Sequence, residues 1–199
     1  QVLLALMLVP LTVTAPYVLL EPEQPSSEVP FPESLSPGPE GYLLVVLDGV
    51  GENIMRDASM MPNLVDQMEE SAVLSITTGP LTLSATCVRE MMTGVPNAPI
   101  DGLKNFNMGH PGGKDPWLLA GESDRYSVGM IGSYVMGNMY GERDDIEFVN
   151  TFEGHADYYE GDRATGDVLE QWLASDRHNV IAVHFSGPDK VGHLSLIHI

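Results

Sequence analysis

The sequence predicts an α/β fold with a mostly parallel sheet and helices on both faces. Two observations lead to this prediction. Short apolar runs of strand length alternate along the chain with segments whose apolar residues recur at helical spacing. A hydrophobic content of 43% in 199 residues is also sufficient to bury a core of ordinary domain size.

Four runs are predicted as strands, at 42–47, 72–77, 126–131 and 179–185. The first of them (YLLVVL) is continuously apolar, as expected of a parallel strand buried in a sheet. Helices are predicted over 62–68, over 89–93 before Gly94, and over 162–173. Because ligands gather at the carboxyl ends of parallel strands, functional side chains are expected to follow these strands.

The segment that precedes this domain has two distinct parts. Residues 2–20 carry no charged side chain, and a helix of that length, at about 1.5 Å per residue, nearly matches a hydrocarbon core about 30 Å thick. Residues 1–20 are therefore predicted to be a membrane anchor, with a cleavable signal peptide and a buried soluble helix as alternatives. Residues 21–40, rich in Pro, Glu and Ser, are interpreted as an extended linker to a folded domain in 41–199.

Charge excludes one class of partner. The chain has 28 acidic and 9 basic residues, for a formal net charge of -19, so a nucleic-acid backbone would be repelled. Cys87 is the single cysteine, which excludes a disulfide framework and a cysteine-based metal site within the chain.

Two motifs place reactive side chains near the ends of predicted elements. Asp48 directly follows the first strand and precedes Gly-Val-Gly, where a carboxylate could hold a cation, although Asp-Gly is also a common turn. Ser84 lies where an extended segment passes into a helix, and the backbone N–H groups there favour an anion such as phosphate. A metal ion beside Ser84 would make its hydroxyl a nucleophile; a helix N-cap is the alternative interpretation.

A third motif, GPDKVGH, follows the last predicted strand. Asp189 and His193 are four residues apart, so in a helical turn both side chains project from one face. A carboxylate oxygen and an imidazole nitrogen suit zinc or a similar divalent metal, while a surface aspartate with an unrelated histidine is the alternative. Among the other histidines, His184 is predicted to be a hydrogen-bonded core residue and His155 a solvated loop residue, with an accessory metal site as the alternative.

Together these motifs resemble the alkaline phosphatase superfamily. The elements LDGVG after an apolar strand, a serine shortly before the Thr93-Gly94 pair, and PDKVGH after a strand occur in that order. The sequence is similar in particular to the type I phosphodiesterases/nucleotide pyrophosphatases and to the GPI ethanolamine phosphotransferases. The similarity covers residues 41–193 and includes PIDGLKNFN after the Thr-Gly pair.

The resemblance implies a three-layer α/β/α sandwich of the alkaline phosphatase type, two divalent metal ions, zinc or a similar metal, and a serine nucleophile. Asp48 would bind one metal ion together with Ser84, whose oxygen would attack phosphorus. Asp189 and His193 would bind the other. Asn105 would donate a hydrogen bond to a phosphoryl oxygen.

The expected function is phosphoryl transfer from a phosphoester, in the form of phosphoethanolamine transfer to a lipid-linked glycan. The enzymatic alternative is a phosphodiesterase, nucleotide pyrophosphatase or phosphatase ectoenzyme, and a non-catalytic fragment that retains the fold is an alternative of another class. A sulfatase is excluded because Ala-Thr-Cys-Val follows Ser84. The expected location is a membrane, with a single N-terminal span and the catalytic domain on the extracytoplasmic or luminal side.

One departure from the family pattern concerns the end of the chain. The family completes its metal sites with a later Asp-His pair and a further histidine, which the 199 residues do not supply. We therefore expect the fold to be incomplete at its C-terminus and the chain as printed to be inactive.

Overall fold

The computed structural model describes residues 41–109, 111, 115–153 and 158–196. The predicted anchor (1–20), the predicted linker (21–40) and His155 lie outside these ranges. No helix in the described ranges has the length and apolar character of a membrane span.

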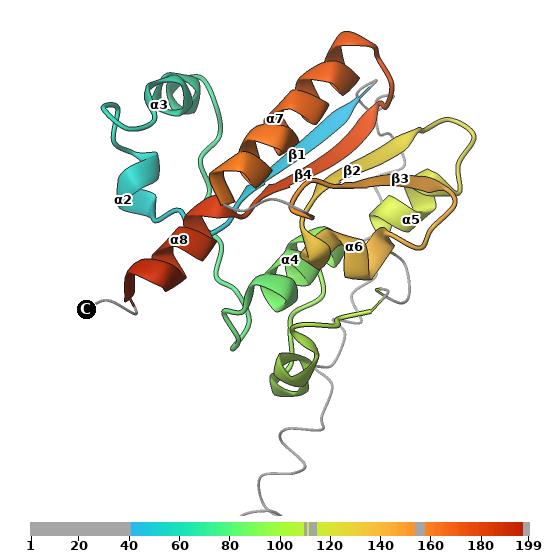
Figure 1. Cartoon of the computed structure of the whole chain (residues 1–199), viewed down its shortest axis with the longest axis horizontal. Coiled ribbons are helices and arrows are strands. Elements are labelled where there is room, and N and C mark those ends of the chain that lie inside the picture. Colours follow the sequence, from blue (N-terminus) through green and yellow to red (C-terminus); the bar gives the residue numbers. More distant parts are fainter. Residues whose placement is uncertain (1–40, 110, 112–114, 154–157, 197–199) are drawn as a thin grey trace, which may run out of the picture.

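One parallel sheet forms the centre of the molecule (Figure 1). Its strand order is β1-β4-β2-β3, and every neighbouring pair is parallel. The strands are β1 (Tyr42–Leu47), β2 (Val128–Gly132), β3 (Ile146–Asn150) and β4 (Val180–Phe185). The predicted α/β class is confirmed.

Helices cover both faces of the sheet. The helices α4 (Ser84–Thr93), α5 (Pro116–Gly121) and α6 (Tyr134–Tyr140) pack on one face, where Met130 and Ala182 lie in the larger core cluster. The other face carries α7 (Tyr158–Ala174), whose Trp172 joins Ile131, Ile181 and Val183 in a second cluster. Alternation along β4 places Ala182 and Val183 in different clusters, as the two-residue period of a strand requires.

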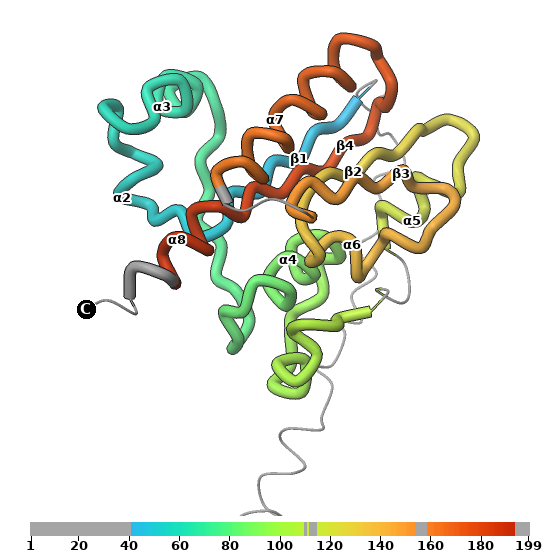
Figure 2. The backbone as a smooth tube through the Cα atoms, in the orientation of Figure 1, coloured from blue at the N-terminus to red at the C-terminus, as the bar shows by residue number. Residues whose placement is uncertain are grey.

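The remaining elements lie at the carboxyl end of the sheet or beyond it. After β1 the chain forms α2 (Glu52–Met55) and α3 (Pro62–Glu69), which stand to one side of the sheet before the chain returns to α4 (Figure 2). A 3-10 helix, η1 (Pro99–Lys104), follows α4. The last helix, α8 (Gly187–Leu196), continues almost directly from β4.

Two strand predictions were wrong in part. No strand forms over 72–77, and the side chains of Leu74 and Ile76 are 81% and 84% exposed, because this segment has no neighbouring strand to pair with. Strand β1 is present, but it is an edge strand rather than a buried one, and Leu43 and Val45 remain exposed. No strand was predicted at β3, because Glu147 and Asn150 interrupt the apolar pattern of this segment.

Candidate functional site

The strand order brings the first and third motifs to one place. In the parallel pair of β1 and β4, Val46 lies opposite His184 and Leu47 opposite Phe185. The ladder continues by one bond, because the backbone N–H of Asp48 donates to the carbonyl of Phe185 at 2.9 Å. Asp48 and the start of α8 therefore leave the carboxyl edge of the sheet side by side, although more than half of the chain separates them.

Gly49 fixes the contact between this edge and α8. Its φ of +74° lies in the left-handed region, which glycine enters without steric cost. A Cβ atom at this position would lie 2.5 Å from the Cα of Asp189 and 2.6 Å from its backbone nitrogen. The turn after Asp48 thus packs directly against the backbone of Asp189, which explains why glycine stands there.

The second motif joins the same edge. Ser84 is the first residue of α4, and its hydroxyl lies beside the half-buried carboxylate of Asp48, where it helps to lower the pKa of that carboxyl. Burial favours the neutral form of this carboxyl. The hydrogen bonds from His184 and Ser84, with the nearby positive charge of Lys190, outweigh that effect and hold the pKa of Asp48 below its ordinary value. Asp48 is therefore an ionised carboxylate beside a hydroxyl at neutral pH.

Asn105 lies at the N-terminus of the same helix. Its Oδ1 accepts the backbone N–H of Ala85 at 3.3 Å, which places the side chain beside the first turn of α4. Because Oδ1 is turned toward the protein, Nδ2 is the atom that could donate to an anion bound near Ser84. The structure thus brings Asn105 to Ser84, and the predicted hydrogen bond to a phosphoryl oxygen stays a prediction.

Asp189 and His193 lie on one face of α8, as their spacing predicts. The Nε2 atom of His193 is 3.4 Å from Oδ1 of Asp189. The imidazole is 76% exposed and the carboxylate 20%, so the pair faces solvent at the edge of the site. Both side chains are accessible to a ligand from that side.

His184 is completely buried on β4, and its Nε2 lies 3.3 Å from Oδ2 of Asp48. The prediction of a hydrogen-bonded core histidine is confirmed. Its partner, however, is a candidate site residue, which the sequence did not indicate because the pairing of β1 with β4 is needed to see it.

Asp162 is a second residue that sequence reasoning missed. Its carboxylate accepts the backbone N–H groups of Ser186 and Gly187 at 3.1 Å, so it holds the N-terminus of α8 against α7. Burial raises the pKa of Asp162, and these two hydrogen bonds offset the effect only in part. A single aspartate at the start of a predicted helix carries no signal for this long-range role.

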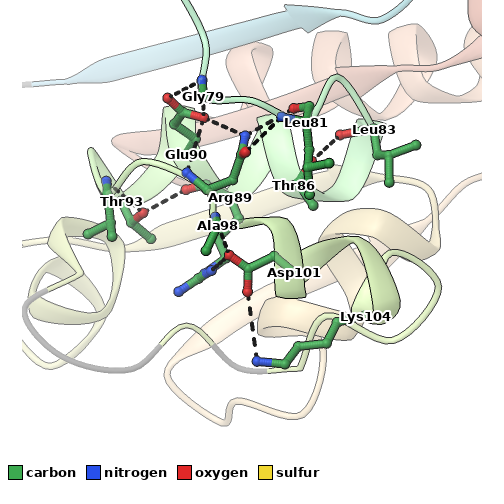
Figure 3. A network of polar contacts seen from close by, with 12 residues as sticks. Gly79, Leu81, Leu83, Thr86, Arg89, Glu90, Thr93, Ala98, Asp101 and Lys104 are labelled. Atoms are coloured by element: carbon green, nitrogen blue, oxygen red, sulfur yellow. Dashed lines mark hydrogen bonds and ion pairs between the residues drawn. The ribbon is translucent and has the colours of Figure 1, made fainter. Parts of the chain in front are cut away.

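A polar network holds the loop that enters α4 (Figure 3). The carboxylate of Glu90 accepts the N–H of Gly79 at 3.0 Å and the amide of Asn97 at 2.7 Å. The side chain of Asn97 also makes two hydrogen bonds to the backbone of Leu81. Its Oδ1 accepts the N–H of Leu81 and its Nδ2 donates to the carbonyl of Leu81, both at 3.0 Å. The backbone before Ser84 is therefore held by partly buried hydrogen bonds.

The same figure shows how η1 is attached to α4. Asp101 is nearly buried, accepts the N–H of Ala98 at 2.9 Å, and pairs with Arg89 at 3.2 Å and Lys104 at 3.7 Å. Since Asn105 directly follows η1, this charge cluster determines where the Asn105 amide lies relative to Ser84.

The donors at this edge suit a divalent metal in kind. Asp48 with Ser84, and Asp189 with His193, each combine oxygen or nitrogen atoms that zinc accepts. Among residues 41–109, 111, 115–153 and 158–196, no group of three or more His, Cys, Asp or Glu side chains is arranged to hold a metal ion. Each predicted pair would therefore form part of a four-ligand shell.

One cavity between described residues lies away from this chemistry. It measures about 300 Å³ and is lined at the other end of β1 and β4 by apolar side chains, Tyr42, Leu44, Met91, Met92, Pro116, Trp117 and Val180. Its lining offers no nucleophile or carboxylate, so the polar edge is the better candidate for the functional site.

Comparisons with known proteins gave no match: no family model, no curated protein and no solved structure resembles the chain significantly. The functional argument rests on the motifs and on the geometry described above.

Proposed function

We propose that this protein is a metal-dependent phosphoryl-transfer enzyme of the alkaline phosphatase superfamily that acts on phosphoesters through Ser84. The observation that carries the proposal is the position of Ser84, at the start of α4, beside the ionised, half-buried carboxylate of Asp48. The turn at Gly49 places this pair next to Asp189, so all three motifs of the resemblance contribute to one edge of the sheet.

The start of α4 suits the phosphoryl group of a substrate. The positive end of the dipole of a ten-residue helix favours an anion at this place. Nδ2 of Asn105 adds a neutral donor at the same place, because its Oδ1 is already bonded to Ala85. These groups would orient the phosphoryl oxygens while Ser84 approaches phosphorus.

Two divalent cations, zinc or a similar metal, fit the donor chemistry of the site. Asp48 and Ser84 would hold one, and Asp189 and His193 would hold the other. Bound there, such ions would stabilise the attacking and leaving oxygens of an in-line displacement.

The covalent chemistry belongs to Ser84. Its Oγ forms a bond to phosphorus as the bond between phosphorus and the leaving oxygen breaks. The hydroxyl proton passes to bulk water. Asp48 accepts the hydrogen bond of that hydroxyl beforehand and so aligns Oγ. Attack by a second oxygen nucleophile on the phosphoseryl group then restores Ser84.

The acceptor defines the reaction class. Water as acceptor makes the enzyme a phosphodiesterase or phosphatase, and an alcohol makes it a transferase. The similarity of residues 99–107 to the phosphotransferase segment and the predicted anchor in residues 1–20 favour phosphoethanolamine transfer to a lipid-linked acceptor.

The test uses the complete gene product with zinc and bis(p-nitrophenyl) phosphate, with release of nitrophenol as the readout. Ser84→Ala should lower turnover by about 10³-fold or more with an unchanged circular dichroism spectrum. Ser71→Ala, at an exposed serine outside the site, should retain the parent's rate. Mass spectrometry of the quenched parent should find phosphate on the peptide that contains Ser84.

Three outcomes would contradict the proposal. Full turnover in Ser84→Ala would remove Ser84 as nucleophile, and indifference to EDTA would remove the metal requirement. Zinc binding without turnover of this diester or of the corresponding monoester would favour the non-catalytic alternative.

A further inference from the structure

His184 links two polar side chains, and one of them lies beside the proposed nucleophile. Its Nε2 lies 3.3 Å from Oδ2 of Asp48, and its Nδ1 lies 3.5 Å from Oγ of Ser133. Asp48 in turn lies beside Ser84, the first residue of α4. These side chains thus extend from the carboxyl end of β2, through β4 and β1, to the start of α4.

The partners of His184 determine which ring nitrogen carries the proton. The Asp48 carboxylate only accepts hydrogen bonds, so Nε2 is the N–H that donates to it. Ser133 Oγ accepts the backbone N–H of Val135 at 3.4 Å as the N-cap of α6, which leaves its own proton for Nδ1 of His184. A neutral ring with its proton on Nε2 satisfies every contact.

His184 lies in close packing with the neighbouring strand. Its side chain has no solvent exposure. Gly132, at the end of β2, has a φ of +153°, and a Cβ atom there would lie 2.9 Å from the Cβ of His184 and 3.1 Å from its carbonyl oxygen. The neighbouring strand therefore carries glycine where the backbone and Cβ of the histidine need space.

We infer that His184 is a positioning residue that holds Oδ2 of Asp48 and so directs this carboxylate toward the divalent cation of the site. The inference rests on the proposed function, because it assigns His184 a role only through Asp48. A buried N–H donor on one oxygen removes the rotational freedom of the carboxylate, so less entropy is lost when a cation binds. Ser133 supports the ring from the opposite side.

The test measures zinc affinity of the complete gene product by competition with a chromophoric chelator, a readout independent of turnover. His184→Leu removes the donor and should weaken zinc binding about 10- to 100-fold, as is typical when a partner of a metal ligand is lost. His184→Gln retains a side-chain N–H near the position of Nε2 and should recover most of the affinity. Ser133→Ala should give a smaller loss than His184→Leu.

Asp48→Ala separates this inference from the proposed function. Weak binding in Asp48→Ala with parental binding in His184→Leu would overturn the inference alone. Parental binding in both variants would overturn the metal site of the proposed function as well. If circular dichroism shows that His184→Leu does not fold, the zinc affinity of Ser133→Ala becomes the test. A zinc affinity equal to that of the parent in Ser133→Ala then overturns the inference.

Discussion

The two ends of the sheet hold their charges in different ways. At the amino end, Glu147 accepts hydrogen bonds from both Nε (2.9 Å) and Nη2 (3.0 Å) of Arg177 and lies 3.0 Å from Nε2 of His178. At the carboxyl end, Asp48 lies 3.3 Å from Nε2 of His184 and Asp189 lies 3.4 Å from Nε2 of His193, and neither carboxylate pairs with an arginine in the described part of the chain.

The two edges therefore differ in how far the charge of their carboxylates is neutralised. Glu147 is neutralised in a two-pronged pair with Arg177, which leaves it little tendency to bind another cation. Asp48 is ionised and half-buried, and it has His184 and the more distant positive charge of Lys190 nearby but no two-pronged arginine partner. The comparison therefore supports the proposal of a functional site at the carboxyl edge.

The largest effect is expected from a substitution that disturbs the backbone contact between Gly49 and Asp189 at the carboxyl edge. Gly49→Ala should destabilise the fold by about 3 kcal/mol or more, because it adds left-handed strain to a clash with the Asp189 backbone. Gly94→Ala is the matched control, since Gly94 has a φ of +70° with nothing within 4 Å of an added Cβ. Its cost should be about 1 kcal/mol. Urea unfolding of both variants measures the difference, and equal losses would show that the contact with Asp189 contributes nothing.

The next largest effect is expected from the loss of the Glu147 carboxylate at the amino edge. Glu147→Leu leaves the nearly buried Nε2 of His178 without its acceptor and should cost about 1–3 kcal/mol in the free energy of unfolding. Glu170→Leu, at an exposed position of α7, should change it by less than about 0.5 kcal/mol. Zinc affinity should be unchanged in Glu147→Leu, and a loss of affinity would contradict the separation of the two edges.

The sequence predicted the α/β class and the local spacing on α8, and the roles of the candidate site residues stay predictions. Asp189 and His193 are adjacent on α8 because four-residue spacing in a helix is local information. The resemblance named Asp48, Ser84 and Asn105, and the structure brings Ser84 to Asp48 and Asn105 to the same helix N-terminus.

The parts that sequence reasoning missed depend on contacts between distant segments. The 72–77 segment has strand-like composition, but a strand needs a partner and none is available to it among the described residues. His184 and Asp162 acquire their roles only when β4 pairs with β1 and when α7 packs beside α8. No local pattern in one sequence encodes such contacts.

The dependence of the free energy of unfolding on pH tests the role of His178 at the amino edge. Burial, assisted by the charge of Arg177, lowers the pKa of His178, and the hydrogen bond to Glu147 offsets this only in part. The unfolded chain then binds more protons than the folded one below about pH 6.5. The free energy of unfolding should therefore fall as the pH falls from 7.5 to 5.5, by at most about 1.4 kcal/mol per pH unit for this group.

His178→Gln should reduce that slope, measured by urea unfolding in EDTA. An identical slope in parent and His178→Gln would mean that His178 does not titrate differently in the folded and unfolded chains.

The smallest expected effect is the dependence of the Arg177–Glu147 pair on salt. Arg177 is 55% exposed and Glu147 36%, so a double-mutant cycle with Arg177→Gln and Glu147→Gln should give a coupling energy of about 0.2–1 kcal/mol at low salt. In 1 M NaCl the Debye length falls to about 3 Å, and the coupling should decrease. The contact between His184 and Asp48 has a fully buried partner, so the same cycle with His184→Leu and Asp48→Ala should depend less on salt. Equal salt dependence at both edges would show that the carboxyl edge is as open to solvent ions as the amino edge, and would remove the electrostatic distinction between them.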